Sequence, residues 1–193
     1  GFNGTSPYMQ SIGELSDGTL IIGGVFTTYD GVSANRIVGI NPDGTINATF
    51  SYGTGFSGGG QAVVNIEVDS QDRVYVGGGF TSYNGTTASC IIRLTATGSV
   101  DPTFNIGTGL LGGTPFAYSI ELDEANGRIY IGGQFTTYNG TSANRIVCLL
   151  EDGTIDTSFN YGTGFSAAFG TRRLRLGPDD KLYCIGGFTS YNG

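Results

Sequence analysis

One phrase occurs four times in this 193-residue chain: two glycines, at most one further residue, and then Phe-Thr-Thr/Ser-Tyr-Asn/Asp-Gly. Its phenylalanines, at spacings of 54, 55 and 53 residues, are Phe26, Phe80, Phe135 and Phe188. A second phrase, a phenylalanine followed after two residues by Gly-Thr-Gly, recurs with it at Phe50, Phe104 and Phe159. A period near 54 residues that survives small insertions indicates one supersecondary unit copied along the chain, with each copy burying its apolar faces against the next.

Each copy carries four short strand signals, which are clearest in the second copy. Apolar and polar residues alternate over residues 63–69, and residues 73–80 form an apolar run that ends in three glycines. Residues 90–95 and 99–104 are the third and fourth predicted strands. The first and third strands are followed by tight turns, where other copies place the Asp-Gly or Asn-Gly typical of hairpins. A longer loop, residues 81–89, joins the second strand to the third.

The second and third strands are apolar on both faces, as Leu20, Ile21 and Ile22 show in one strand and Ile91 and Ile92 in another. Such strands must be covered on both sides, as they are in blades stacked face to face. The sequence therefore predicts an all-β chain of β-propeller blades, each a four-stranded antiparallel meander of about 54 residues. A stacked β-solenoid is the alternative, although its rungs are usually too short for a whole meander.

The repeats divide this one propeller segment, residues 1–193, at residues 1–54, 55–108, 109–163 and 164–193. The last copy is about half the length of the others, because it stops directly after its first phrase. Since a natural boundary inside a repeat is rare, we expect the chain to be a segment of a longer protein. We therefore expect an incomplete ring of blades.

The charge of the chain excludes some classes of partner. Its formal charge is −7, and the nearest approach to a basic patch is Arg172, Arg173 and Arg175, which occurs in one copy only. Binding to nucleic acid requires clustered Lys and Arg, so we expect no nucleic-acid partner. No apolar run approaches the roughly 18 residues that a membrane-spanning helix needs, so we expect no membrane insertion.

The cysteines and the absence of histidine limit the chemistry. Cys90, Cys148 and Cys184 replace other residues within apolar strand patterns, which predicts buried free thiols and no disulfide or metal site. Without histidine, the Ser-His-Asp and Cys-His arrangements and the histidine metal sites are absent. The Asp-Gly turns lack the alternating Asp of a calcium loop, and no helix or Lys follows Gly-Thr-Gly as in a phosphate loop. We expect no cofactor.

The third copy resembles a known repeat. Residues 129–159 run through an apolar strand, Gly-Gly-x-Phe-Thr, Tyr-Asn-Gly, Arg-Ile and Asp-Gly-Thr-Ile-Asp-Thr-Ser-Phe. This combination is similar to the delta-60 repeat, and the resemblance covers essentially the whole chain. It implies a β-propeller with more blades than these, without an established catalytic set, of the kind found in bacterial surface or secreted proteins and in phage structural proteins. The usual Arg-Leu ending of the third strand is kept at Arg93 and Leu94, whereas Arg36 and Arg145 lie three positions earlier.

Acidic residues repeat on the first strand. The alignment of copies places Glu14, Glu67 and Glu121 at one position and Arg175 in the fourth copy. Carboxylates repeated around a ring could converge on a central channel and bind a cation, so these four residues are candidate channel-lining residues. Pairing of each Glu with an Arg from the third strand, or solvation in the channel, is the simpler interpretation, because repeated charges usually serve repeated packing.

The loop of the first phrase places an aromatic ring beside an amide in most copies. Its candidate binding residues are Tyr29, Tyr83, Asn84, Tyr138, Asn139 and Tyr191. Aromatic and amide groups on one loop face could stack on a sugar and bond to it. The alternative is that each Tyr packs over the Phe-Thr strand end while Asn-Gly makes the turn. That alternative is favoured because the motif does not vary between copies.

Catalysis has little support. A two-carboxylate glycosidase would need acids unique to particular copies, such as Asp30, Glu124 or Glu151. Each of these has an ordinary turn or loop explanation, so we expect no catalytic residues and no enzyme activity.

These observations favour a non-enzymatic structural and interaction module, part of a bacteriophage virion protein such as a tail or fibre component. We expect it in virions or outside the cell, with other protein subunits or the remainder of its own longer chain as partners. A bacterial surface or secreted adhesin that binds surface glycans is the alternative, located at the bacterial cell surface. A glycan-cleaving propeller is the third hypothesis.

Overall fold

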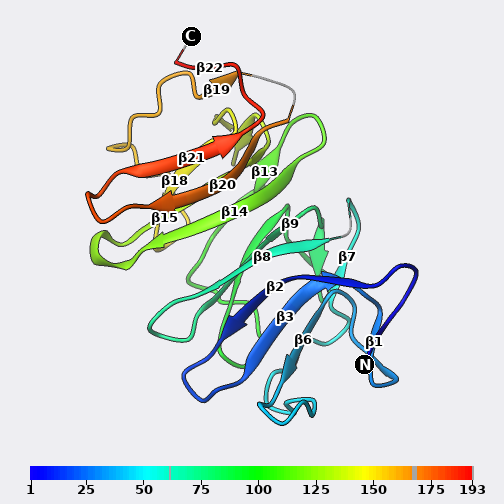
Figure 1. Ribbon diagram of the computed structural model, residues 1–193. Helices are drawn as coiled ribbons and strands as arrows, with labels where there is room; N and C mark the ends of the chain where they lie inside the picture. The colour runs from blue at the N-terminus through cyan, green and yellow to red at the C-terminus, as the bar shows by residue number, and fades with distance from the viewer. Residues whose placement is uncertain (61, 167–168, 193) are drawn as a thin grey trace. The chain divides into compact units, whose positions relative to one another are not determined.

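The computed structural model describes residues 1–60, 62–166 and 169–192. Short antiparallel sheets make up the chain, together with one 3-10 turn, η1 (Glu124–Asn126) (Figure 1). Two compact units are formed, Gly1–Asp101 and Pro102–Gly193. Each unit contains two sheets that pack face to face, as propeller blades do. The prediction of an all-β fold of propeller blades is confirmed.

The first unit holds two three-stranded blades. The first blade is β2 (Tyr8–Glu14), β3 (Leu20–Val25) and β6 (Ile37–Ile40), and the second is β8 (Val63–Val68), β9 (Val74–Gly78) and β12 (Ile91–Leu94). Within each blade the strands pair antiparallel in this order. The first strand of the second blade, β8, lies against β2 and β3 of the first blade (Figure 1).

The second unit repeats this arrangement with a smaller second blade. Its first blade is β14 (Phe116–Asp123), β15 (Arg128–Gln134) and β18 (Ile146–Leu150), and its second is β20 (Thr171–Leu176) and β21 (Leu182–Gly186). Strand β20 packs against β14 and β15, as β8 does on β2 and β3 (Figure 1). Among the described residues, no strand pairs with the outer edge of β21.

The predicted long loop after the second strand is wrong in one respect, because it folds into a small hairpin. In each complete copy this hairpin pairs with the segment that opens the same repeat. These small sheets are β1 (Phe2–Asn3), β4 (Thr28–Tyr29) and β5 (Val32–Ser33); β7 (Phe56–Ser57), β10 (Ser82–Tyr83) and β11 (Thr86–Thr87); and β13 (Leu110–Leu111), β16 (Thr137–Tyr138) and β17 (Thr141–Ser142). In the fourth copy β19 (Phe165–Ser166) pairs with β22 (Ser190–Tyr191). Asn84 and Gly85 at the hairpin tip have φ of 46° and 79°, the left-handed values that a two-residue type I′ turn requires.

The predicted fourth strand, residues 99–104, is also wrong. Only the bridge between Leu94 and Val100 remains of it. The reason is visible in the third copy, where the Asp156 carboxylate accepts from the Ser158 N–H at 2.8 Å and closes a turn in place of a ladder. Each complete blade is therefore three strands plus one bridge.

Glycine allows the blades of a unit to approach each other. A Cβ added to Gly23 would overlap Cγ1 of Val63, and one added to Gly132 would lie 2.8 Å from Cγ2 of Thr171. Both glycines sit at the same register of the second strand, and each receives a residue from the first strand of the next blade. The core of the first unit is thus continuous across its two blades, with Val63 and Ile66 buried.

Candidate functional site

The tyrosine of the first phrase anchors the turn between the third and fourth strand positions. The Tyr83 hydroxyl donates to the carbonyl oxygen of Gly98 at 2.6 Å, and the Tyr138 hydroxyl donates to that of Gly153 at the same distance. Tyr29 makes the equivalent bond to Gly44, again at 2.6 Å. The three complete copies therefore use the phenol internally, over a sequence separation of 15 residues.

For Tyr83 and Tyr138, burial supports packing over the strand end, which the sequence favoured, rather than an open ring face for a sugar. Tyr83 and Tyr138 are each 1% exposed, and the Tyr83 ring packs 4.7 Å from the ring of Phe56. A ring buried to this degree offers no open face, so neither residue can stack on a ligand from solvent. Tyr29 is half-buried, and Tyr191, in the copy without a third strand, is 46% exposed.

The amides of the same phrase hold the second phrase. The side-chain oxygens of Asn84 and Asn139 accept from the backbone N–H groups of Thr54 and Thr108, each at 3.2 Å. Both threonines belong to Gly-Thr-Gly, and in the fourth copy Asn192 binds the corresponding threonine at 2.7 Å. The two repeated phrases are therefore joined to each other in every copy where the bond is described. Asn84 and Asn139 act as structural acceptors.

The strand register corrects the alignment of the acidic residues. Glu67 lies opposite Tyr75 and Glu121 opposite Tyr130, whereas Glu14 lies opposite Leu20, one step further along the hairpin. Gly13, opposite Ile21, holds the position that the later copies give to glutamate. The sequence alignment therefore misplaced Glu14 by one residue.

Glu121 binds the neighbouring blade of its own unit. Its carboxylate is 7% exposed and accepts from the backbone N–H of Leu176 at 2.8 Å. The Arg175 guanidinium lies 3.3 Å from the same carboxylate, although most of that side chain is exposed. In the other unit, Glu67 accepts from the Asn65 amide at 3.1 Å. These contacts give Glu121 and Arg175 a role between blades, but the arginine comes from the first strand of the next blade and not from a third strand, as the pairing interpretation expected.

A buried ion pair that the sequence did not predict joins Arg93 to Asp101. Arg93, 1% exposed, donates to Asp101 at 2.7 Å and lies over the Tyr75 ring with its guanidinium carbon 5.5 Å from the centroid. In the third copy Asp156 has the same place in the repeat, but its partner is Arg128, at 2.7 Å. The sequence carries one sign of this pair, the aspartate that recurs in the predicted fourth strand as Asp101 and Asp156. The arginine leaves no repeated pattern, because it comes from different strands in the two copies.

Arg36 and Arg145 bind different acceptors from Arg93, which explains why they lie three positions earlier in the repeat. The Arg145 guanidinium donates to the Phe165 carbonyl of the next blade at 2.9 Å, and Arg36 makes the same bond to Phe56. Both arginines adopt left-handed φ, 68° and 65°, just before the third strand. The conformation turns the side chain away from its own blade and toward the opening strand of the next one.

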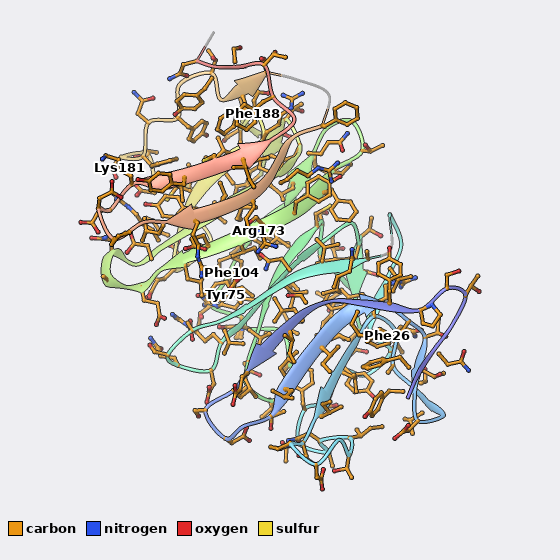
Figure 2. The ribbon with its side chains drawn as sticks, viewed as in Figure 1. Phe26, Tyr75, Phe104, Arg173, Lys181 and Phe188 are labelled. Carbon is orange, nitrogen blue, oxygen red and sulfur yellow. The ribbon has the colours of Figure 1, made fainter. Side chains whose placement is uncertain are left out.

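Two hollows lie side by side in the second unit. The first hollow has a volume of about 460 Å³ and is mainly apolar. Its lining includes Ile146, Phe159, Leu182, Cys184, Phe188 and Tyr191. The second, about 390 Å³, is more polar and is lined by Ser142, Asn160, Tyr161 and others. Phe159 lines both hollows, and Leu182 and Cys184 of β21 line the first. In Figure 2, Lys181 and Phe188 mark the two ends of that strand.

The three thiols are free, and two of them are fully enclosed. Cys90 and Cys148 are buried, whereas Cys184 is half-buried on the wall of the apolar hollow. Burial raises the pKa of Cys90 and of Cys148 to about 12 and that of Cys184 to about 11. The expectation of free thiols is confirmed, and complete burial holds for two of the three.

The remaining candidate acids occupy turns and loops. Asp30 accepts from the N-terminal amine of Gly1, Glu124 begins the 3-10 turn, and Glu151 is exposed in the turn after β18. Over residues 1–60, 62–166 and 169–192, no group of three or more Cys, Asp or Glu side chains is placed to hold a metal ion. No helix among the described residues is long and apolar enough to cross a membrane.

One protein family matches the chain, described as a domain of unknown function (DUF5122) beta-propeller. The match covers residues 15–50, 72–104 and 124–159, which is more than half of the chain. Each matched stretch begins near the turn between the first two strands and ends at the phenylalanine of the second phrase. No curated protein matches the sequence.

Proposed function

The chain belongs to the DUF5122 beta-propeller family, and from this premise we propose that it is a non-enzymatic structural and interaction module. We propose further that it works in a bacteriophage tail or fibre or a comparable extracellular assembly, beside other protein subunits. One observation carries the proposal. The repeated polar groups that a ligand would use are bonded to the chain itself, as Tyr83 is to Gly98 and Asn84 to Thr54.

The distribution of these bonds supports a mechanical role. The tyrosine bond ties the two ends of one blade, and the Arg145 bond ties a blade to the next one within its unit. Loops that are already held by hydrogen bonds lose little further conformational entropy when a partner binds. This favours the role of a rigid structural component. Repetition of the same contacts in each copy makes stability additive along the array.

The assembly role is tested with an antibody against the chain. Particles from a culture that produces the protein are purified, and tail and fibre fractions are probed separately. Signal in an intact-particle fraction that survives a high-salt wash is the expected result. Signal confined to the bacterial surface or to the culture medium would contradict the virion proposal and favour the adhesin.

Catalysis is tested independently. We expect the purified chain to release no reducing ends from a panel of bacterial polysaccharides. Turnover that is abolished by Glu151→Gln or Glu124→Gln would contradict the non-enzymatic proposal. Glycan binding stays an alternative prediction, but burial removes two of its four tyrosines from contact with solvent.

A further inference from the structure

We propose that Arg172, together with the aromatic residues on which it packs, binds the carboxylate of an acidic sugar. The site lies within the second unit, between β14 and β20, which pack against each other (Figure 1). It differs in place and in chemistry from the repeated tyrosines, whose hydroxyls are bonded within the protein. Such a sugar site adds to the proposed assembly role and does not require it.

The basic side chains are mostly neutralised by the chain itself. Of the nine Lys and Arg residues, Arg172 and Arg173 have no acidic or carbonyl acceptor among residues 1–60, 62–166 and 169–192. The other seven each bind a carboxylate or a carbonyl: Arg36, Arg73, Arg93, Arg128, Arg145, Arg175 and Lys181. In a chain with a formal charge of −7, a negative ligand is therefore attracted to this one segment.

The guanidinium of Arg172 is held over an aromatic ring of the neighbouring blade. Its central carbon lies 4.0 Å from the centroid of the Tyr118 ring. The ring of Phe116 stacks on the same tyrosine, with the centroids 4.6 Å apart and the planes inclined by 19°. Two groups this close to one centroid cannot share a face of the ring, so Arg172 and Phe116 cover opposite faces. The contact holds the arginine in place and leaves its N–H groups to bind a carboxylate.

Tyr118 is itself positioned by hydrogen bonds. Its hydroxyl donates to Oε1 of Gln134 at 3.2 Å, and Nε2 of Gln134 donates to the hydroxyl oxygen of Thr114 at 3.1 Å. Thr114 is exposed, and a hydroxyl that accepts one bond still has its own proton to donate. Gln134 is half-buried and has a second amide hydrogen. These groups supply partners for sugar hydroxyls beside the partner for a carboxylate.

The site occurs once, although the backbone that carries it is repeated. Tyr118 and Arg172 are the extra residues of the bulges on β14 and β20, and bulges re-aim side chains beside binding sites. At the corresponding bulges of β2 and β8 the residues are Gln10 and Val64, which are neither aromatic nor charged. The internal bond of Tyr83 recurs in each complete copy, as a structural contact should. A group found in one place only is typical of a site for a particular ligand.

The size and charge of the site favour a sugar over a larger anion. A protein partner typically covers about 800 Å² on each side, whereas this site consists of a few side chains around one ring. Nucleic acid and other polyanions are repelled by the charge of the whole chain. A sugar with a single carboxylate needs one guanidinium, a few hydrogen-bonding groups and an aromatic neighbour. The ligand class is therefore a hexuronic acid or its glycoside.

The test uses the full chain and two small probes, methyl β-D-glucuronide and methyl β-D-glucoside. The probes differ only in that the glucuronide has a carboxylate in place of a hydroxymethyl group. Binding is followed by NMR, from the shifts of backbone amides as each probe is added at constant ionic strength. We expect the glucuronide to shift amides within residues 114–118 and 171–173. The glucoside should bind at least about tenfold more weakly, because it lacks the charge-assisted bond.

Adjacent arginines provide the matched control. Arg172→Gln should weaken glucuronide binding about tenfold, whereas Arg173→Gln should leave it within about twofold. Arg173 lies opposite Ile185, and Leu174 beside it packs against Gly132, so Arg173 faces away from the first blade of this unit. Tyr118→Leu, which removes the ring, should also weaken binding. Circular dichroism checks that each variant folds as the unaltered chain does.

Several outcomes would overturn the inference. Equal weakening by Arg172→Gln and Arg173→Gln would show a diffuse effect of charge, and equal binding of the two probes, or binding of neither, would show that no carboxylate is recognised. Tighter binding of an acetylated Gly-Glu-Gly peptide would replace the sugar by an acidic protein segment. None of these results affects detection of the protein in tail or fibre fractions, so failure of the sugar site and failure of the assembly role are distinguishable.

Discussion

The hydroxyl of Tyr83 lies 2.6 Å from the carbonyl oxygen of Gly98 and joins the small hairpin before β12 to the turn after β12. Both groups are inside the protein, and burial raises the pKa of the Tyr83 phenol well above its ordinary value. The phenol is therefore neutral and donates its proton to the carbonyl. The first repeated phrase has the composition of a ligand-binding loop, but its tyrosine stabilises the blade to which it belongs.

Removal of this hydroxyl should destabilise the first unit. Tyr83→Phe leaves the Gly98 carbonyl buried without its donor, which costs about 1–2 kcal/mol of unfolding free energy. Urea unfolding followed by circular dichroism measures the change. Tyr191→Phe is the matched control, because Tyr191 has no such acceptor among the described residues and is 46% exposed. An equal loss in both variants would contradict the fastening role.

The blades could be predicted from the sequence because their signals are local and repeated. Alternating residues in 63–69, Asp-Gly turns and double-sided apolar strands each specify a strand or a hairpin without tertiary information. The fourth strand failed because Asp156 can either continue a ladder or close a turn, and only the surrounding packing decides.

The candidate site was harder to predict, because a side chain is available to a ligand only if it is not already hydrogen-bonded within the protein. Tyr83 and Asn84 have the side chains of a binding loop, and their burial and partners are set by residues 15 to 30 positions away in the sequence.

Loss of one partner of the buried ion pair should be costly. Arg93→Met leaves the Asp101 carboxylate enclosed without its guanidinium, and we expect a loss of roughly 3–5 kcal/mol. Arg128→Met is the comparison: its side chain is 32% exposed and Asp156 keeps the Ser158 N–H and hydroxyl as donors, so we expect a smaller loss of about 1–2 kcal/mol. Unfolding midpoints of the two variants measure the difference. Similar losses would indicate that the burial of Arg93 is not what matters.

Steric contact at the blade interface gives a third prediction. Gly23→Ala places a methyl group against Val63 and should destabilise the first unit by about 1–3 kcal/mol. The double variant Gly23→Ala with Val63→Ala should recover part of that loss, because the smaller side chain makes room. Ile185→Ala, at the same register of an exposed strand face, should change stability little. A double variant no better than the sum of its singles would argue against this contact.

Acid should weaken the turns that follow the third strands. The Thr45 hydroxyl and N–H donate to the Asp43 carboxylate at 2.6 and 2.9 Å, and these bonds hold its pKa below the usual 3.8. A pKa lowered by folding means that the stabilisation is complete above the unfolded pKa and is lost as the pH falls through the folded one. We expect stability to be level from about pH 7 to 5 and to decline below about pH 4. Asp43→Asn, which keeps an acceptor oxygen, should reduce that decline in urea titrations, and an unchanged slope would contradict the assignment.

Thiol reactivity should follow enclosure. The pKa of Cys184, raised by burial to about 11, leaves about one molecule in a thousand as thiolate at pH 8. Alkylation of the native chain should therefore be slow, rise about tenfold per pH unit and reach Cys184 first, because it alone is half-buried while Cys90 and Cys148 are fully enclosed. Peptide mapping after iodoacetamide treatment at pH 7, 8 and 9 measures the order, and denaturant should expose all three thiols. Modification of Cys90 ahead of Cys184 would show that the blade containing β12 opens more readily than the edge of β21.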